Sequence, residues 1–481
     1  MKMYKVFIFM ILSFAIVSCT QNEMFDKSNE IIGGGDRLVI KLTPAEYFSI
    51  AFDGENELSD EDAEIIFKEF LVSGNVTRGS LADLNFSINE HYYLETSASD
   101  LSVRSAKSQS EIKLVEFKIN SKTRSNENEE DGFALVVADN RFPNVIAFAE
   151  KGNIENADRN GAGLMIQRAK NVAANYISAI VKYQDSLRTE TIDKIEKYIT
   201  EPYSFEKVKD ALFIEKAETR VSADPNPPGT PLATIGPLIN VRWIQGFPQN
   251  QFIQKCSPED LVYWPEISYG GRYPAGCTAV AVATALSYFK PTIYSNDLGR
   301  YVNWTTALSN PIIYPWDFAD DEYVKEAAAI LKEVATGIKT TYGPGGGSAN
   351  MNDASAYMKK LGISIDGRTE LSYLTVRPSI GQYRPVILTG TARRVRSSTR
   401  AETSGSHAWV MDGLKIMIRP SSHVGPQTEL KYYNNYGWCN FGWAFSAYNG
   451  WYLFDNDGSI EFDCGSDRYD IDLAAYPNIR R

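Results

Sequence analysis

The chain has 481 residues, of which 43% are hydrophobic, so it can bury a large core. A charged fraction of 23% is ordinary for folded proteins and excludes global disorder. The net charge of −11 argues against nucleic acid as the main partner, because phosphate binding needs clustered Lys and Arg. At roughly 150 residues per domain, this length predicts two to four domains.

The acidic excess lies entirely in the first half of the chain. Residues 1–240 carry 26 basic and 37 acidic side chains, whereas residues 241–481 carry 23 of each. This asymmetry indicates two regions with different roles, although a solvated acidic face explains the charge equally well.

The first 18 residues have the pattern of an export signal. Lys2 and Lys5 precede an apolar run that is too short to span a membrane comfortably. The run ends at Cys19, and residues 16–19 resemble the lipobox of bacterial lipoproteins, in which the cysteine is acylated. This resemblance implies export and a lipid anchor on Cys19 in a bacterial membrane, at the outer membrane or cell surface. A secretory signal with a chance cysteine is the alternative.

Mixed patterns follow the export signal. Residues 19–35 are polar and contain three consecutive glycines, which indicates a flexible tether. Apolar spacing then predicts helices, and alternation predicts strands, within a domain over 36–220. The expected helices cover 61–71 and most of 161–217, and the expected strands cover 37–42, 113–120, 132–139 and 144–150.

A proline-rich linker separates this domain from the rest of the chain. Residues 221–237 contain five prolines and two glycines, so they are expected to be extended, exposed and open to proteolysis. The second region, 238–481, holds all eight tryptophans, which predicts a separate core. In this region helical patterns come first and strand patterns later.

Cys277 is the first candidate catalytic residue. It follows Gly276 and precedes an alanine-rich apolar run, so the pattern predicts a helix that begins at this cysteine. The exposed N–H groups of a helix N-terminus favour the thiolate, which is the nucleophile for acyl transfer. A structural cysteine on a packed helix is the alternative.

His407 is the matching candidate base. It follows a polar loop and starts an apolar strand 130 residues after Cys277, so a separate element could bring it to the sulfur. A structural histidine at a strand end is the alternative interpretation.

Two amide side chains complete the predicted site. Asn435 ends a strand-like segment, and its carbonyl could accept from the imidazole N–H and orient the ring. Gln245 could donate to a developing oxyanion. The alternatives are an Asn-containing turn and an exposed loop glutamine.

Several motifs occur in one order along the second region. They are Trp243, Gln245 and Pro248 in a WxQxxP pattern, Gly276-Cys277, the glycine-rich 340–349, RPVILTG at 384–390, SHAWVMDG at 406–413, NYGW at 435–438 and NGWY at 449–452. Together they resemble the streptopain family of cysteine peptidases, in the papain-like superfamily. Residues 132–153 resemble the propeptide strands of that family.

The resemblance implies an α+β fold class and a role for each motif residue. A papain-like peptidase domain, with a helical part and an antiparallel sheet part, is expected over 238–481, preceded by an α+β propeptide domain over 36–220. The implied catalytic residues are the nucleophile Cys277, the general base and acid His407, the orienting Asn435 and the oxyanion-hole donor Gln245. The implied substrate-binding residues are Gly276, Gly345, Gly346, Ser348, Ser406 and Trp438.

The expected function is an exported cysteine endopeptidase made as an inactive zymogen. It would hydrolyse protein or peptide substrates through a thioester acyl-enzyme, with its own propeptide as inhibitor until the linker at 221–237 is cut. Cutting would also release the peptidase from its membrane anchor. No cofactor or metal is expected, because no cluster has zinc-ligand spacing, and no nucleic acid partner is expected.

Some points stay open in the sequence. Asn440 in a second motif, NFGW, is the alternative to Asn435. Cys439 could pair with Cys464. A papain-like amidase or transferase and a degenerate protease-fold binding lipoprotein are the alternative functions. Tyr436, where the family usually has tryptophan, keeps the last of these under consideration.

Overall fold

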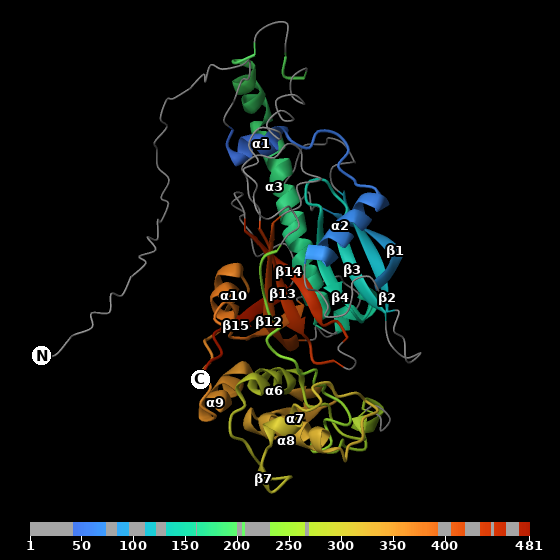
Figure 1. The fold of residues 1–481 in the computed structure, drawn as a ribbon, viewed down its shortest axis with the longest axis vertical. Coiled ribbons are helices and arrows are strands. Elements are labelled where there is room, and N and C mark those ends of the chain that lie inside the picture. Colours follow the sequence, from blue (N-terminus) through green and yellow to red (C-terminus); the bar gives the residue numbers. More distant parts are fainter. Residues whose placement is uncertain are drawn as a thin grey trace, which may run out of the picture. The chain divides into compact units, whose positions relative to one another are not determined.

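A computed structural model gives the fold of the chain (Figure 1). It describes residues 42–73, 84–95, 111–121, 131–159, 161–199, 204–206, 231–264, 269–392, 406–418, 433–443, 447–457 and 471–481. The predicted export signal, the tether, Cys19, residues 221–230 of the linker and Cys464 lie outside these residues, as does nearly all of the strand expected at 37–42. Among the described helices, none is long and apolar enough to span a bilayer.

The first region contributes three α-helices and four strands to the described structure. α1 begins with a capping box, in which the Thr43 hydroxyl accepts from the Glu46 N–H and the Glu46 carboxylate accepts from the Thr43 N–H. The helix and the three strands expected between residues 61 and 150 are confirmed. The elements are α1 (Pro44–Ile50), α2 (Asp60–Ser73), β1 (Leu84–Glu95), β2 (Glu111–Ser121), β3 (Gly132–Val137), β4 (Asn144–Ala149), the 3-10 helix η2 (Ile154–Arg159) and α3 (Ala162–Glu196).

The second region begins mainly with helices and ends with strands, as its patterns predict. The described part of the linker also forms a strand, β5 (Pro231–Ile235). The elements that follow are η3 (Asp260–Val262), α6 (Cys277–Phe289), β6 (Tyr294–Ser295), β7 (Arg300–Tyr301), α7 (Trp304–Ala307), α8 (Glu322–Gly337), β8 (Thr341–Gly343), β9 (Gly346–Ser348), α9 (Met351–Lys360), β10 (Thr369–Glu370), α10 (Tyr373–Ile380), β11 (Val386–Ala392), β12 (Ser406–Ile418), β13 (Tyr433–Asn440), β14 (Gly450–Asp457) and β15 (Ile471–Tyr476).

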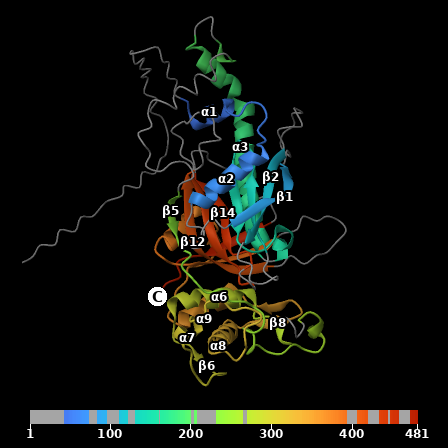
Figure 2. The same cartoon turned by 45° about the vertical axis from the view of Figure 1, so that its right-hand side comes forward.

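One antiparallel sheet joins strands of both regions. Within the described residues it has 11 strands, in the order β1-β2-β3-β4-β14-β13-β12-β11-β15-β10, with β5 paired to β12. Figure 2 shows β1 and β2 of the first region toward one side of this sheet, and β5, β12 and β14 of the second region toward the other. The two regions meet where β4 pairs with β14, in the register Phe148 opposite Trp451. The chain is therefore a mixed helix and antiparallel-sheet protein.

Two hydrophobic cores pack on this sheet. In the first, α3 lies along β14 and β4 (Figure 1). The aromatic side chains of α2 pack on strands of both regions, with Phe67 on Phe117 of β2 and Phe70 on Tyr436 of β13. In the second, α6 packs against β12, α8 and α9. α6 is apolar on nearly all sides, and residues 278–287 are all buried, which suits a helix at the centre of a core.

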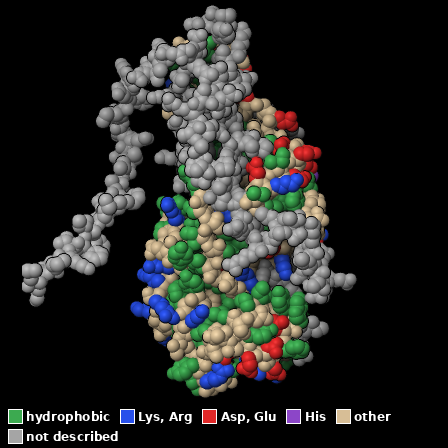
Figure 3. All heavy atoms as spheres, viewed as in Figure 1, with side chains coloured by type: hydrophobic (Ala, Val, Ile, Leu, Met, Phe, Trp, Pro, Cys, Tyr) green, Lys and Arg blue, Asp and Glu red, His purple; other side chains and the backbone are tan. Residues whose placement is uncertain are grey.

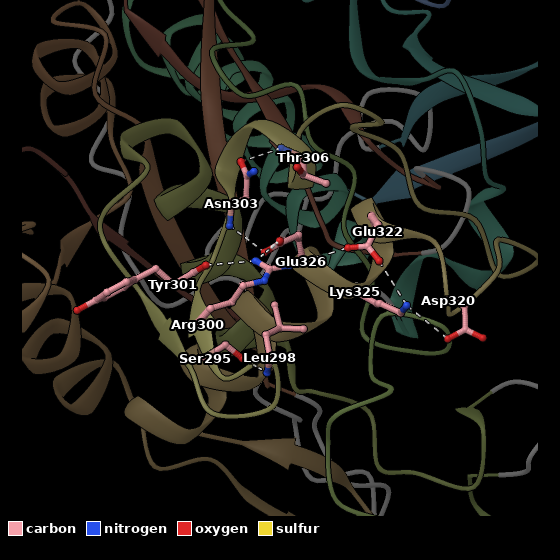
Figure 4. A network of polar contacts seen from close by, with 10 residues as sticks. All are labelled: Ser295, Leu298, Arg300, Tyr301, Asn303, Thr306, Asp320, Glu322, Lys325 and Glu326. Carbon is pink, nitrogen blue, oxygen red and sulfur yellow. Dashed lines mark hydrogen bonds and ion pairs between the residues drawn. The ribbon is translucent and has the colours of Figure 1, made fainter.

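A polar network ties the short β6–β7 hairpin to α8. Arg300 donates to the carboxylate of Glu326 at 2.6 Å, and the Asn303 N–H donates to its other oxygen at 2.8 Å (Figure 4). Glu326 is buried, so these two charge-assisted bonds compensate for its desolvation.

Candidate active site

Cys277 is the first residue of α6, as the sequence predicts. The preceding Gly276 has φ 95°, and a Cβ there would lie 2.5 Å from the carbonyl oxygen of Gly347. Only glycine meets both conditions, so this turn requires it. The turn presents the thiol where the free N–H groups of the helix favour an anion.

The structure brings His407 to this sulfur from β12. His407 is the second residue of the strand, pairs with Gly390 of β11 and is mostly buried. Burial raises the pKa of the Cys277 thiol, but a hydrogen bond with His407 and its charge outweigh burial, so that pKa is lowered overall. The Ala408 backbone and the Thr278 side chain add to the lowering. The pair therefore favours a thiolate.

A backbone carbonyl orients the other side of the imidazole. His407 Nε2–H donates to the carbonyl oxygen of Phe441 at 3.2 Å. The Trp443 ring stacks on the imidazole with 5.5 Å between centroids and 16° between planes, and Trp409 stacks at 6.0 Å. Sequence reasoning missed Phe441, because a carbonyl acceptor leaves no residue-type signal. The aromatic residue after Asn440 in NFGW was the available clue.

Asn435 lies far from His407. The sequence pattern predicts a strand that ends at Asn435, but β13 continues to Asn440, and Asn435 pairs with Ile416. Ile416 is nine residues along β12 from His407, which is about 30 Å at the usual strand rise. The side-chain nitrogen and oxygen of Asn435 have no hydrogen-bond partner among the described residues. The structure thus gives Asn435 no part in orienting the histidine.

Asn440 instead shapes the turn that carries the Phe441 carbonyl. Its Nδ2 donates to the Val241 carbonyl at 2.9 Å, and its Oδ1 accepts from Gly442 N–H at 3.3 Å and Asn449 Nδ2 at 3.2 Å. These three bonds hold the Asn440 side chain on its own turn and its neighbours, so it supports the position of the Phe441 carbonyl.

Gln245 lies next to the Cys277 turn. Its carbonyl accepts from the Ala275 N–H at 3.0 Å. The segment before it is held by Asp412 of β12, whose carboxylate accepts from the Ile239 N–H at 2.7 Å. Burial raises the pKa of Asp412 to about 7.

The glycine-rich β8–β9 hairpin packs on the same turn. A Cβ on Gly347 would lie 2.7 Å from the Ala275 carbonyl oxygen, and Thr278 Oγ1 donates to the Ala349 carbonyl at 3.2 Å. Gly345 faces open space, since a Cβ there would meet nothing within 4 Å. The predicted substrate-binding residues Gly276, Gly345, Gly346 and Ser348 are thus brought to the Cys277 side of the fold.

Of the remaining two predicted substrate-binding residues, one lies beside His407 and the other lies away from it. Ser406 is exposed and directly precedes His407 on β12. Trp438 pairs with Gly413, six residues along β12 from His407, and packs its buried ring on Trp451. Trp438 therefore lies away from the site, and Trp443 takes the place beside the histidine.

The first region reaches the histidine directly. Gly161, with φ 73°, precedes α3, and a Cβ there would lie 2.3 Å from Cδ2 of His407. The start of α3 is therefore in van der Waals contact with the imidazole.

Three cysteines lie in the described part of the chain. Within the described residues, Cys256, Cys277 and Cys439 are free thiols. Cys439 is fully buried, and its expected partner Cys464 lies outside those residues. Within the described part of the chain, no group of three or more His, Cys, Asp or Glu is placed to hold a metal ion.

Part of the chain matches a known protein family. Residues 243–452 match the model of the Peptidase C10 family. The matched segment runs from Trp243 to Tyr452, so the Peptidase C10 match contains Gln245, Cys277 and His407.

Two relatives accompany the Peptidase C10 match. The thiol protease/hemagglutinin PrtT of Porphyromonas gingivalis is 22% identical over 379 residues, which cover 72% of this chain and 35% of that protein. The chain thus spans about a third of the length of this curated relative. The solved structure of a prointerpain A fragment from Prevotella intermedia covers 82% of this chain and 99% of its own, with 14% identity and a TM-score of 0.40.

Proposed function

We propose that this chain is a cysteine endopeptidase that is made as an inactive zymogen. The observation that carries the proposal is the hydrogen-bonded Cys277–His407 pair at the N-terminus of α6, where the pKa of the thiol is lowered. The Peptidase C10 match over residues 243–452 and the likeness to a thiol protease support the same chemistry.

Each residue of the pair has a defined step in this proposal. The Cys277 thiolate attacks the carbonyl carbon of a peptide bond, and the Cys277 N–H with the Gln245 amide stabilises the oxyanion. His407 then gives a proton to the leaving amine, and the thioester remains. Water, deprotonated by His407, hydrolyses the thioester and restores the thiolate. The Phe441 carbonyl holds the imidazole in the orientation that these proton transfers need.

The zymogen part of the proposal rests on the contact between α3 and His407. With Gly161 against the imidazole and β4 paired to β14, the first region occupies one side of the candidate site. We infer that residues 36–220 inhibit the peptidase and that a cut within 221–237 begins their removal, because a substrate backbone needs the space beside the histidine.

The first experiment compares residues 20–481 with the Cys277→Ala variant under a reducing agent. We expect the parent chain to shorten to roughly its second half and to cleave casein, while Cys277→Ala stays full length and inactive. Cys256→Ala, which removes the other partly exposed thiol, should behave like the parent. Equal cleavage by the parent and Cys277→Ala would reveal a contaminant. Silence of both after trypsin cleavage at Arg220, directly before the linker, would contradict the peptidase proposal.

We also propose export and lipid anchoring through Cys19, on the basis of residues 16–19. In a bacterial host fed labelled palmitate, the full chain should take up label and Cys19→Ala should not. An unlabelled parent chain would contradict the anchor.

A further inference from the structure

In the turn formed by η3 and the two residues after it, a charged side chain faces the protein and apolar side chains face solvent. Successive side chains of a 3-10 helix point about 120° apart, so one of them normally faces the protein. Here that residue is the charged Asp260, whereas the three apolar residues after it face solvent. Their exposed fractions are 41% for Leu261, 78% for Val262 and 58% for Tyr263. We refer to these three residues as the apolar ridge.

Hydrogen bonds fix the ridge from both sides. Before it, the Tyr273 hydroxyl donates to the Asp260 carboxylate at 2.6 Å. After it, the Trp264 N–H donates to the Asp260 carbonyl at 3.3 Å, and Trp264 Nε1 donates to the Gly343 carbonyl at 3.4 Å. The ridge is therefore exposed on an anchored turn, and turning its side chains into the protein would break these bonds.

The ridge is continuous with the candidate active site. Gly343 ends β8 of the hairpin that packs on the Cys277 turn, and a Cβ on Gly346 would meet the Trp264 ring at 3.4 Å. Tyr273, four residues before Cys277, stacks on Tyr342 of the same hairpin with 5.6 Å between centroids. The turn, the hairpin and the start of α6 thus form one packed assembly.

Exposure alone would not single out this ridge. Hydrophobic side chains are spread over much of the face shown in Figure 3, as on most soluble proteins. The ridge differs because three consecutive apolar residues face outward over an inward carboxylate, beside a candidate catalytic centre. Such anchored apolar surface is typical of a binding site.

We propose that the apolar ridge docks an apolar side chain of the polypeptide substrate, at a position remote from the bond that Cys277 attacks. This inference rests on the proposed peptidase function and names a determinant of its specificity. The occupant is an extended polypeptide, because the ridge adjoins the hairpin beside the nucleophile. Burying an aliphatic side chain there removes apolar area from water on both partners, and remote contacts of this kind help to hold the scissile bond in place.

The test uses the full chain after maturation under reducing conditions. The probes are quenched-fluorescence decapeptides that each carry one leucine at a different position in a Ser/Ala background, and a short substrate that reaches only the residues next to the bond. The variant is Leu261→Ser/Val262→Ser/Tyr263→Ser. The matched control is Leu374→Ser, which removes an 81% exposed leucine from α10, a helix that packs on the other core.

We expect the parent enzyme to prefer leucine at one remote position. The triple variant should lose that preference, with about a tenfold fall in kcat/KM through KM, in the range that one hydrophobic contact supplies. Its kcat/KM on the short substrate should stay at the parent value, which also shows that the variant is folded. Leu374→Ser should match the parent on every probe.

Three outcomes would overturn the inference. If the triple variant keeps the parent preference, or loses the short and long substrates equally, the ridge does not bind substrate. If size-exclusion chromatography shows a dimer that only the triple variant breaks, with unchanged peptide cleavage, the ridge binds a second copy of the chain. If the parent cleaves no peptide and no casein, the proposed function fails first, and the ridge proposal falls with it.

Discussion

Cys277 and Cys256 are partly exposed thiols of one chain in opposite surroundings. The pKa of Cys277 is lowered by His407 despite burial, whereas burial and the nearby Asp260 raise the pKa of Cys256. Because only the thiolate reacts, iodoacetamide at pH 5–6 should alkylate Cys277 at least about tenfold faster than Cys256. Site-resolved mass spectrometry measures both rates in one sample.

The same experiment on His407→Ala isolates the cause of this difference. Without the imidazole, only the Ala408 backbone and the Thr278 side chain still oppose the effect of burial on the pKa of Cys277. Its alkylation profile should therefore move to higher pH, toward that of Cys256. If the two cysteines of the parent chain share one pH profile, the ion pair does not form.

Asn440 and Asn435 provide a second test at the residue scale. Asn440→Ala removes the bonds that shape the turn around the Phe441 carbonyl, so kcat should fall about 10- to 100-fold with little change in KM. Asn435→Ala removes buried polar atoms that have no partner among the described residues, so activity should stay within about twofold of the parent. Steady-state kinetics on one peptide, with melting temperatures for both variants, would check this. The reverse ranking would contradict the placement of β13.

The sequence could predict the residues whose signal is local. Gly276-Cys277 before an alanine-rich run marks a helix start, and His407 opens an apolar strand. The orienting group could not be predicted, because NYGW and NFGW start only five residues apart, at Asn435 and Asn440, and the strand pattern does not say where β13 ends. The carbonyl of Phe441 belongs to a residue type that has no acid–base chemistry of its own.

At the scale of elements, β12 carries a buried lysine between the two regions. The Lys415 ammonium lies 4.5 Å from the Phe70 ring of α2 and 4.7 Å from the Trp451 ring of β14. It has no hydrogen-bond partner among the described residues, and burial lowers its pKa to about 7. The neutral amine is therefore the form that the folded chain favours above that pH.

The sign of the resulting pH dependence follows from proton binding. Between pH 7 and about 10.5 the unfolded chain holds the lysine proton and the folded chain does not, so stability should rise with pH, by at most about 1.4 kcal/mol per unit. Lys415→Met should be more stable than the parent near pH 7 and should lack this slope. Denaturant unfolding between pH 8 and 10 measures it, above the range where the buried Asp412 titrates. Parallel slopes in the two proteins would contradict a buried, unpaired Lys415.

Periodicity predicted elements better than it predicted their partners. Alternation predicted β2, β3 and β4, and apolar spacing predicted α2, because each pattern depends only on residues that are neighbours in the sequence. The pairing of β4 with β14 joins segments about 300 residues apart, and the pairing of β5 with β12 turns part of a proline-rich linker into a strand. Neither pairing leaves a local trace in the sequence.

At the scale of the whole molecule, Gly161 offers a way to release the first region. Gly161→Ala should push the start of α3 off His407 and speed self-shortening of the chain under a reducing agent, because the added Cβ has no room. Gly54→Ala is the matched control: Gly54 also has a positive φ, of 92°, but nothing lies within 4 Å of its Cβ position. Gel electrophoresis over time gives both rates. If Gly161→Ala shortens no faster than Gly54→Ala, the contact with the imidazole does not restrain maturation.

The shared sheet has a consequence for the chain if it is cleaved as proposed. β4 covers one side of β14 along Gly450, Trp451 and Tyr452. Once the first region departs, this apolar strand becomes an open edge with unpaired N–H and C=O groups, and bare edges of this kind recruit other strands. The mature peptidase should therefore self-associate through β14, unless another segment takes the place of β4. β4 completes the sheet during folding, and its loss would then make the shortened chain prone to aggregate.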